Sequence, residues 1–439
     1  MEFGKHIGKG LWAFADKALP ALYGIGFIFL VVRALPEREY GAFVIVQTIF
    51  TVVSMMAIAL ALQPLTKFAA EKKENGPYIV AALTLTATFF ALGVFIFVGG
   101  KRFIIPYLDP DPHSLLLLLF NYLPLTFFTA WYRIFSISLL QASYDVRKIF
   151  WIDAAYFLGT LILVYCLSKM HMFNTAEDLL RINIMTQAAS SFLALVFTAK
   201  TMSVSLRFKK DAFGEMFRFG KFTFGTNSIY TLLTQMDVFF VSSFVGLGGV
   251  AVYNATKIIT RIFDMASQVL QMFLIPFSSK NYALGEKGKL VVTIEKAICF
   301  SSLILLPVFL VSLIVPRELL HFLYHGKYDH GANILRVFGL MALVVPWNSA
   351  VVSYIIGIGK VRDVFYISII YLAVTVPVYW LLTPLLGAVG TSIGLVTTFL
   401  VITVILVRYV QKIIPFTLMG VVRRFEDAWR YAVKKGQLI

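Results

Sequence analysis

The sequence predicts an all-α integral membrane protein with twelve transmembrane helices, arranged as two parallel six-helix bundles around a central cavity. Of its 439 residues, 59% are hydrophobic and only 14% are charged, and its mean hydropathy is +0.82. Soluble domains usually carry about 25% charged residues. The apolar residues fall into repeated long runs, and the two halves of the chain resemble each other. These observations exclude a disordered chain, a fibrous protein and an ordinary cytosolic enzyme.

Twelve apolar runs are each long enough to cross a membrane, since a hydrocarbon core of about 30 Å needs roughly 20 helical residues. The connections between them are short. A membrane glycosyltransferase or polysaccharide polymerase normally needs a large loop or domain for its chemistry, so we expect no enzymatic activity and no catalytic residues. The runs cover residues 8–32, 41–64, 78–99, 113–139, 150–168, 182–200, 222–245, 249–276, 291–315, 332–357, 363–382 and 386–408.

The positive charges predict the orientation of the spans. The formal net charge is +16. If the amino terminus is cytoplasmic, the cytoplasmic segments hold 25 Lys and Arg residues and the outer loops hold 8. This bias is typical of a multi-pass protein of the cytoplasmic (inner) membrane with both termini in the cytoplasm. Because the cations flank apolar runs, they favour contact with membrane lipids over nucleic acid.

Internal similarity predicts two related halves. Gly8-Lys9 and Pro64 in the first half correspond to Gly220-Lys221 and Pro276 in the second, each at an offset of 212 residues. The longest polar connection separates these halves. We therefore expect an N-terminal bundle over 1–205, a C-terminal bundle over 213–410 and a cytoplasmic amphipathic tail over 411–439. The tail is expected to lie on the inner membrane surface, and docking of a cytoplasmic glycosyltransferase is the alternative.

The eighth apolar run carries an unusual polar stripe. Its polar residues recur at spacings of three and four, which places them on one face of a helix. Three charges at mid-helix cost roughly 9 kcal/mol in lipid, more than the apolar residues of the run return. The stripe therefore predicts an aqueous lumen, and an Arg261–Asp264 ion pair that only stabilises packing is the alternative. The stripe consists of Asn254, Lys257, Arg261, Asp264, Gln268 and Gln271.

Other predicted spans contribute polar side chains to similar faces. For each charge among them, an interhelical ion pair or a side chain that reaches the membrane interface is an equal alternative to contact with a ligand. These residues are Trp12, Asp16 and Lys17 in the first run, Gln47 in the second, Arg133 in the fourth, and Asn227 and Asp237 in the seventh.

Four short segments resemble motifs of the polysaccharide-unit flippases, which belong to the multidrug/oligosaccharidyl-lipid/polysaccharide exporter superfamily. Segment 32–43 is similar to their R-x-L-G-x-x-x-F/Y-G turn, although Pro36 replaces its glycine. Asp237 with segment 245–255, segment 323–328 and segment 387–392 resemble three further motifs in the same order. The resemblance implies movement of a polyprenyl-diphosphate-linked oligosaccharide between the leaflets by alternating access, for surface polysaccharide biosynthesis.

This resemblance, together with the polar faces, gives each candidate residue a role. We expect Lys257, Arg261, Arg133 and Lys17 to bind the diphosphate. Trp12, Gln47, Asn227 and Gln268 are expected to contact sugar, and Asp237, Asp264 and Asp16 are candidates for ion coupling.

The same interpretation of the sequence gives the expected partners and an alternative function. No cofactor or metal is expected, and a proton or sodium gradient is a candidate energy source. Membrane lipids, the lipid-linked glycan and polysaccharide-assembly proteins are the expected partners. The alternative function is a cation-coupled multidrug or metabolite antiporter of the same superfamily.

Overall fold

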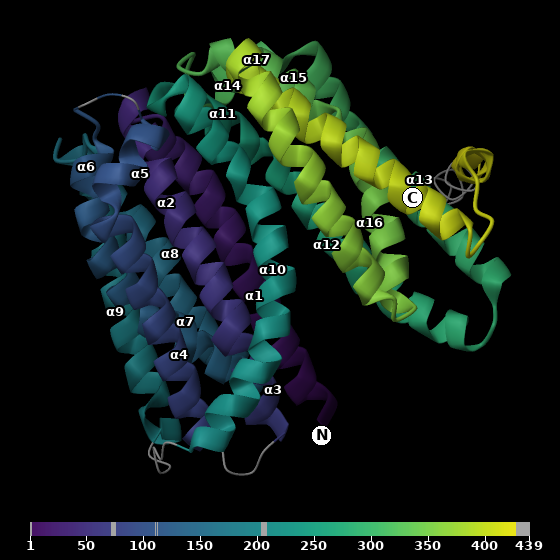
Figure 1. Cartoon of the computed structure of the whole chain (residues 1–439), viewed down its shortest axis with the longest axis horizontal. Coiled ribbons are helices and arrows are strands. Elements are labelled where there is room, and N and C mark those ends of the chain that lie inside the picture. The colour runs from purple at the N-terminus through teal and green to yellow at the C-terminus, as the bar shows by residue number, and fades with distance from the viewer. Residues whose placement is uncertain (1, 72–75, 110, 112, 203–208, 427–439) are drawn as a thin grey trace. The chain divides into compact units, whose positions relative to one another are not determined.

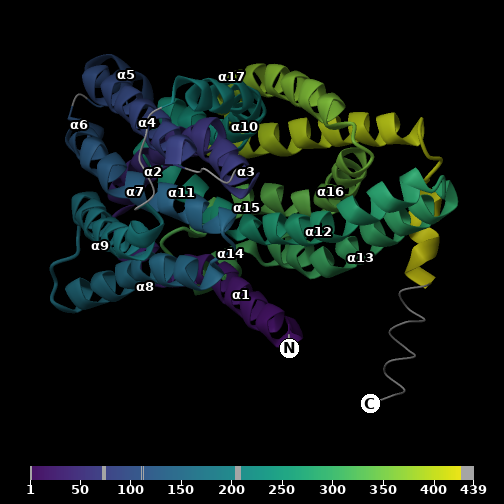
Figure 2. The same ribbon diagram turned by 90° about the horizontal axis from the view of Figure 1, so that it is seen from below.

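The computed structural model describes residues 2–71, 76–109, 111, 113–202 and 209–426, and within these residues the regular structure is helical (Figure 1). The chain divides into two compact units, Met1–Ala251 and Val252–Ile439. Figure 1 draws the first in purple to teal and the second in teal to yellow, and Figure 2 gives the view at right angles.

Unit 1 consists of long helices joined by short connections, with three π-helical turns (η1, η2, η3) inserted where helices bend. Its elements are α1 (Glu2–Phe27), η1 (Ile28–Val32), α2 (Glu37–Ala57), η2 (Ile58–Leu62), α3 (Gln63–Glu71), α4 (Gly76–Val94), η3 (Phe95–Gly99), α5 (Lys101–Leu108), α6 (Leu116–Leu119), η4 (Phe120–Tyr122), α7 (Leu123–Ala142), α8 (Val146–Lys169), α9 (Ala176–Met202) and α10 (Lys210–Val245). Helix α11 (Leu247–Lys257) crosses the boundary between the units.

Unit 2 is built in the same way. Its elements are η5 (Ile258–Thr260), α12 (Arg261–Ala283), α13 (Lys287–Ile314), α14 (Pro316–Tyr324), η6 (Asp329–Gly331), α15 (Ala332–Gly339), α16 (Met341–Gly357) and α17 (Val361–Gln411). A short helix over residues 418–426 follows α17.

Eleven helical segments of the described chain are long and apolar enough to cross a membrane, and each of the twelve predicted runs overlaps one of them. The last segment, the 51-residue α17, holds two of them. Its backbone leaves the helical region at Gly387, where φ is +61°. Thr383 and Thr391 are hydrogen-bonded through their hydroxyl groups at 2.9 Å, so the chain reverses at this glycine and the two parts of α17 lie side by side. The prediction of an all-α, multi-pass membrane protein is confirmed.

Helix α10 belongs to unit 1, whereas the sequence places it at the start of the C-terminal bundle, and the division into bundles over 1–205 and 213–410 stays a prediction. A Cβ atom on Gly220 of α10 would lie 2.0 Å from the carbonyl oxygen of Leu60. The hydroxyl of Thr223 donates to the carbonyl oxygen of Ala59 at 2.6 Å. Both carbonyls belong to the π-helical turn η2, where the ordinary helical pairing is interrupted. Gly220 thus lets α10 approach this turn closely, and Thr223 donates a hydrogen bond to one of its carbonyl groups.

We expect the substitution Gly390→Ala to destabilise the reversal in α17. The added methyl group would lie 2.0 Å from the carbonyl oxygen of Leu382, a backbone atom that cannot move aside cheaply. Such overpacking typically costs about 1–3 kcal/mol, which thermal unfolding of the detergent-purified protein would detect. Gly225→Ala is the matched control, because a Cβ atom there meets nothing within 4 Å. Equal melting temperatures for the two variants would contradict this prediction.

A surface contact joins the start of α2 to the loop before α6. Arg38 forms an ion pair with Asp111, and the backbone N–H of His113 donates to the same carboxylate at 2.9 Å. The N–H of His113 first, and then Arg38, hold the pKa of Asp111 below its usual value. The pKa of Asp111 is thus lower in the folded protein than in the unfolded chain, where it is about 3.9. The contact therefore contributes its full stability above about pH 3.9, and this contribution is lost as the pH falls through the folded-state pKa.

We therefore expect the amide hydrogen of His113 to exchange with solvent more slowly in the unmodified protein than in the Asp111→Asn variant near pH 4, because the variant lacks the carboxylate. Near pH 2 the contact is lost, and the two proteins should exchange this hydrogen at similar rates. Equal exchange rates for the two proteins near pH 4 would contradict the expected role of Asp111.

Candidate functional site

The eighth predicted span is interrupted within its polar stripe. Helix α11 ends at Lys257, a 3₁₀ turn covers Ile258–Thr260, and α12 begins at Arg261. A 3₁₀ turn has 3.0 residues per turn instead of 3.6, so it rotates the two helices relative to each other. The six polar residues therefore lie on two helical segments joined by this turn, and a face common to all six stays a prediction. Asn254 and Lys257 precede the turn, and the other four residues follow it.

On α12 the polar residues face away from the interior of unit 2. Arg261, Asp264 and Gln268 are exposed and Gln271 is half-buried. We call these four residues the polar stripe. Another face of α12 packs on α16, where the hydroxyl groups of Ser267 and Ser349 lie 2.7 Å apart. On that packed face Phe263 and Leu274 are only 3% and 4% exposed.

A second stripe of exposed side chains follows α12 beside the polar one. Ile262, Met265, Val269 and Met272 recur at spacings of three and four residues and are 43–74% exposed. We call them the apolar stripe. At about 100° per residue, its centre lies roughly 100° around the helix from that of the polar stripe. Helix α12 thus exposes a polar, charged surface and an apolar surface next to each other, both outside the packed core of unit 2.

The ion pair that the sequence left as an alternative does not form. Within the described part of the chain, no ion pair joins Arg261 to Asp264. Lys257 is half-buried, and its ammonium group lies 6.0 Å from the centre of the Tyr253 ring. The guanidinium of Arg261 and the carboxylate of Asp264 are both exposed for contact with water or a polar ligand.

Unit 1 contains a charged cluster at the meeting of α1, α7 and α8. Arg133 of α7 forms an ion pair with Asp153 of α8, and both side chains are at most 15% exposed. The guanidinium also lies 4.5 Å from the centre of the Tyr156 ring. Asp16 of α1 is buried and interacts with the carboxyl group of Asp153 and with Arg133. Two carboxyl groups and one guanidinium therefore share a largely buried site.

This cluster leaves polar atoms of its own unsatisfied. Oδ1 of Asp16 and Nε of Arg133 are buried without a hydrogen-bond partner. Buried polar atoms are normally paired, and those that are not often mark functional sites or positions of bound water or ions. The neighbouring hydroxyl of Tyr156 donates to Asn183 of α9 at 3.1 Å. The charged groups of this cluster thus keep an acceptor and a donor that are not used within the described chain.

Trp12 and Lys17 differ in their surroundings. Trp12 packs edge to face on Phe150, with ring centres 5.0 Å apart, and lies 6.3 Å from Trp151. The guanidinium of Arg147 lies 5.7 Å from the Trp12 ring. Trp12 therefore belongs to an aromatic group one helical turn before Asp16. Lys17 is exposed.

The remaining candidates lie on α2 and α10, not on the helices that carry the charged cluster. Gln47 is half-buried on α2. Asn227 joins α10 to α3, since its amide donates to the side-chain oxygen of Gln63 at 3.4 Å. Within α10 the same amide donates to the carbonyl oxygen of Thr223 at 2.9 Å. Asp237 is fully buried, and its carboxylate accepts the N–H of Val238 at 3.0 Å. The sugar-binding and coupling roles of these residues stay predictions.

Sequence reasoning overlooked Asp153. The signal was present, because an acidic residue stands inside the apolar run 150–168, where an unpaired charge is costly. Its partner Arg133 lies 20 residues earlier on another helix, and spacing along one helix does not reveal such a pair.

The fold resembles that of known transporters. The structure matches lipid II flippase MurJ in an inward closed conformation with a TM-score of 0.77, at 13% identity over 95% of this chain and 89% of that one. It matches an inward-facing multidrug resistance MATE transporter of the MOP superfamily with a TM-score of 0.75, at 15% identity over 90% of this chain and 97% of that one. At such identities the likeness concerns the fold. The protein is thus a multi-pass membrane protein that shares the fold of these transporters.

The sequence comparisons define the family. A family model described as "Polysaccharide biosynthesis protein" matches residues 30–333, which is more than half of the chain. The chain belongs to this family. It is also 22% identical, over 210 residues, to the uncharacterized membrane protein MJ1068 of Methanocaldococcus jannaschii. That match covers 47% of this chain and 41% of the relative, so the chain matches less than half the length of this relative.

Proposed function

We propose that the protein is a flippase that moves a polyprenyl-diphosphate-linked oligosaccharide across the membrane by alternating access. The observation that carries the proposal is the pair of adjacent stripes on α12. Charges such as Arg261 and Asp264 are costly in lipid, so the polar stripe needs water or a polar ligand. The apolar stripe beside it needs hydrocarbon. A lipid-linked glycan combines both media in one molecule.

In this proposal the substrate lies along the boundary between the stripes. The diphosphate is held by Arg261, with Lys257 at the preceding turn, because guanidinium and ammonium groups form strong charge-assisted hydrogen bonds with phosphate oxygens. Gln268, two turns further on, contacts the first sugars. The prenyl chain lies along Met265, Val269 and Met272, whose side chains are 56–74% exposed. Membership in the polysaccharide biosynthesis family supports this class of substrate.

Coupling to an ion gradient is assigned to the charged cluster of unit 1. Asp16 and Asp153 lie close enough to interact, and two negative charges side by side repel each other. Binding of one proton or one small cation relieves this repulsion, and Arg133 balances the remaining charge. The unsatisfied Oδ1 of Asp16 is the atom available to receive it. Asp16 was a candidate from sequence, and Asp153 joins it here.

Reconstitution tests the proposal. Purified protein in liposomes that contain a prenyl-diphosphate-linked oligosaccharide should expose the glycan to an added lectin from both leaflets, at a rate well above that of protein-free liposomes. Liposomes that contain lipid II flippase MurJ serve as a comparison for substrate range. A protein that is folded and inserted but leaves the inner-leaflet glycan inaccessible to the lectin would contradict the flippase assignment.

The alternative, a cation-coupled antiporter of drugs or metabolites, is favoured by the same charged cluster and by the likeness of the fold to a multidrug transporter. Deletion of the gene distinguishes the two functions. The flippase account expects loss of surface glycan with unchanged drug sensitivity. The antiporter account expects increased drug sensitivity with normal surface glycan.

A further inference from the structure

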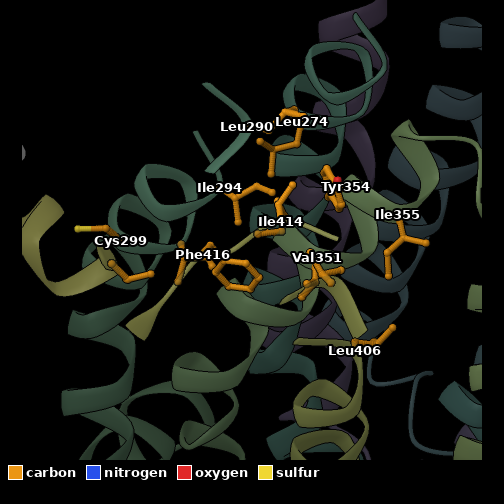
Figure 3. Close-up of a cluster of buried hydrophobic side chains, with 14 residues drawn as sticks. Leu274, Leu290, Ile294, Cys299, Val351, Tyr354, Ile355, Leu406, Ile414 and Phe416 are labelled. Atoms are coloured by element: carbon orange, nitrogen blue, oxygen red, sulfur yellow. The ribbon is translucent and has the colours of Figure 1, made fainter. Parts of the chain in front are cut away.

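The chain does not leave unit 2 when α17 ends. Ile414, Phe416 and Val421 are at most 4% exposed and join the hydrophobic cluster formed by α13 and α16. Figure 3 shows Phe416 and Ile414 among Ile294, Cys299, Val351 and Tyr354. The segment after α17 is therefore folded back against the bundle, and the helix over 418–426, which we call the tail helix, starts from a fixed position.

An ion pair holds the tail helix to α13. The guanidinium of Arg424 donates from Nε and from Nη2 to Glu295, each at 3.1 Å, and the Glu295 side chain is only 5% exposed. The helix also comes close here, since a Cβ atom on Gly420 would lie 1.8 Å from Oε1 of Glu295. The hydroxyl of Thr417 accepts the N–H of Gly420 at 2.9 Å and caps the helix start.

The position of Glu295 along α13 gives the depth of this contact. Helix α13 has 28 residues, a length of about 42 Å, which exceeds the hydrocarbon core by about 12 Å. If the excess lies at the start of the helix, the core begins about eight residues after Lys287, which is at Glu295. The charged pair Glu286–Lys289 occupies the start, as expected for a segment outside hydrocarbon. The tail helix is thus tied to α13 at the boundary between water and lipid.

The outer surface of the tail helix suits this boundary. The side chains of Leu418, Met419, Val422 and Phe425 are 41–66% exposed and share one arc of the helix, opposite Arg424, with the exposed Glu426 at the end of this arc. The exposed cation Arg423 lies at the edge of the arc, and Lys412 at the end of α17 is exposed as well. An apolar arc with Arg423 at its edge is complementary to acyl chains beside anionic phosphate groups.

We propose that the tail helix is an in-plane membrane helix that binds anionic lipid, with its apolar arc in the acyl-chain boundary and its depth set by the Glu295–Arg424 ion pair. The inference does not depend on what the protein transports. It differs from a freely attached amphipathic tail, because the ion pair, Gly420 and the buried Phe416 fix the helix to the bundle before any lipid is present.

Fluorescence quenching in nanodiscs tests the proposal with the full-length chain. The exposed Cys166 is replaced by serine, the buried Cys299 stays, and an environment-sensitive fluorophore is attached at Val422→Cys. Lys287→Cys provides a reference in water and Ile304→Cys, on an exposed apolar position of α13, a reference in lipid. We expect the label at position 422 to be shielded from iodide and to be quenched most by spin labels near the lipid headgroups. Iodide quenching equal to that at position 287 would overturn the proposal and leave the arc free for a protein partner.

Substitution of two neighbouring arginines tests the ion pair and the lipid contact independently. Arg424→Gln should raise iodide quenching at position 422 in nanodiscs of any lipid composition, because the helix loses its tie to Glu295. Arg423→Gln should reduce only the extra shielding gained when phosphatidylglycerol is added to phosphatidylcholine, by about fivefold in the underlying equilibrium. Identical effects of the two variants, or no dependence on phosphatidylglycerol, would contradict the assigned roles.

Discussion

Replacing Lys257 and Arg261 together by glutamine is expected to abolish transport while the protein remains folded in the membrane. Arg261 is exposed and Lys257 half-buried, so neither side chain is part of the packed core. A hydrogen bond to a charged group contributes about 1.5–3 kcal/mol, and the loss of two weakens diphosphate binding roughly a hundredfold or more. Flipping measured by lectin access in liposomes, and surface polysaccharide measured in cells, should both fall accordingly.

Lys280→Gln is the matched control for this double variant. It removes an exposed cation from the last turn of the same helix, α12, five turns away from Arg261. We expect its transport to equal that of the unmodified protein. Normal surface polysaccharide in cells that carry the double variant at ordinary membrane levels would exclude the polar stripe as the diphosphate site.

The second large effect is expected in unit 1. Asp153→Asn leaves the guanidinium of Arg133 without its partner in a site where both side chains are at most 15% exposed. Removing one member of a buried ion pair typically costs about 3–5 kcal/mol. The single variant should therefore unfold at a markedly lower temperature in detergent, and Arg133→Gln should do the same because Asp153 then loses its ion-pair partner beside a second carboxyl group.

The double variant Asp153→Asn with Arg133→Gln separates stability from coupling. It removes both charges, so most of the lost stability should return. If the cluster carries the coupling ion, transport by the double variant no longer responds to an imposed proton or sodium gradient. A double variant that recovers stability and keeps the gradient response of the unmodified protein would show that Arg133 and Asp153 serve the fold alone.

Membrane spans were predictable because span length is a local property. A transmembrane helix satisfies its backbone hydrogen bonds within its own segment. An apolar run can therefore be recognised as a span without knowledge of its distant contacts. The reversal in α17 was also visible as a gap between the runs that end at residue 382 and start at residue 386. Its physical cause, the positive φ of Gly387 and the close approach of Gly390 to Leu382, needed the structure.

The parts of the site that sequence reasoning missed depend on distant contacts or on small changes of helical pitch. The 3₁₀ turn over Ile258–Thr260 separates Lys257 from the polar stripe of α12, and periodicity assumes an unbroken helix. Asp153 meets Asp16 from another helix. Arg424 meets Glu295 across 129 residues of chain. Helix α10 joins unit 1 through Gly220 and Thr223, whose contacts with η2 carry no periodic signal.

Photocrosslinking from α12 tests the central claim most directly. A photoreactive amino acid placed at Gln268, in the polar stripe, should form a covalent adduct with the lipid-linked oligosaccharide in membranes that contain it. The same group placed at Lys280, exposed on the last turn of the helix, should form little or none. An adduct at 268 that disappears when Lys257 and Arg261 are both replaced by glutamine is the predicted result. No adduct at 268, or equal adducts at the two positions, would contradict the account.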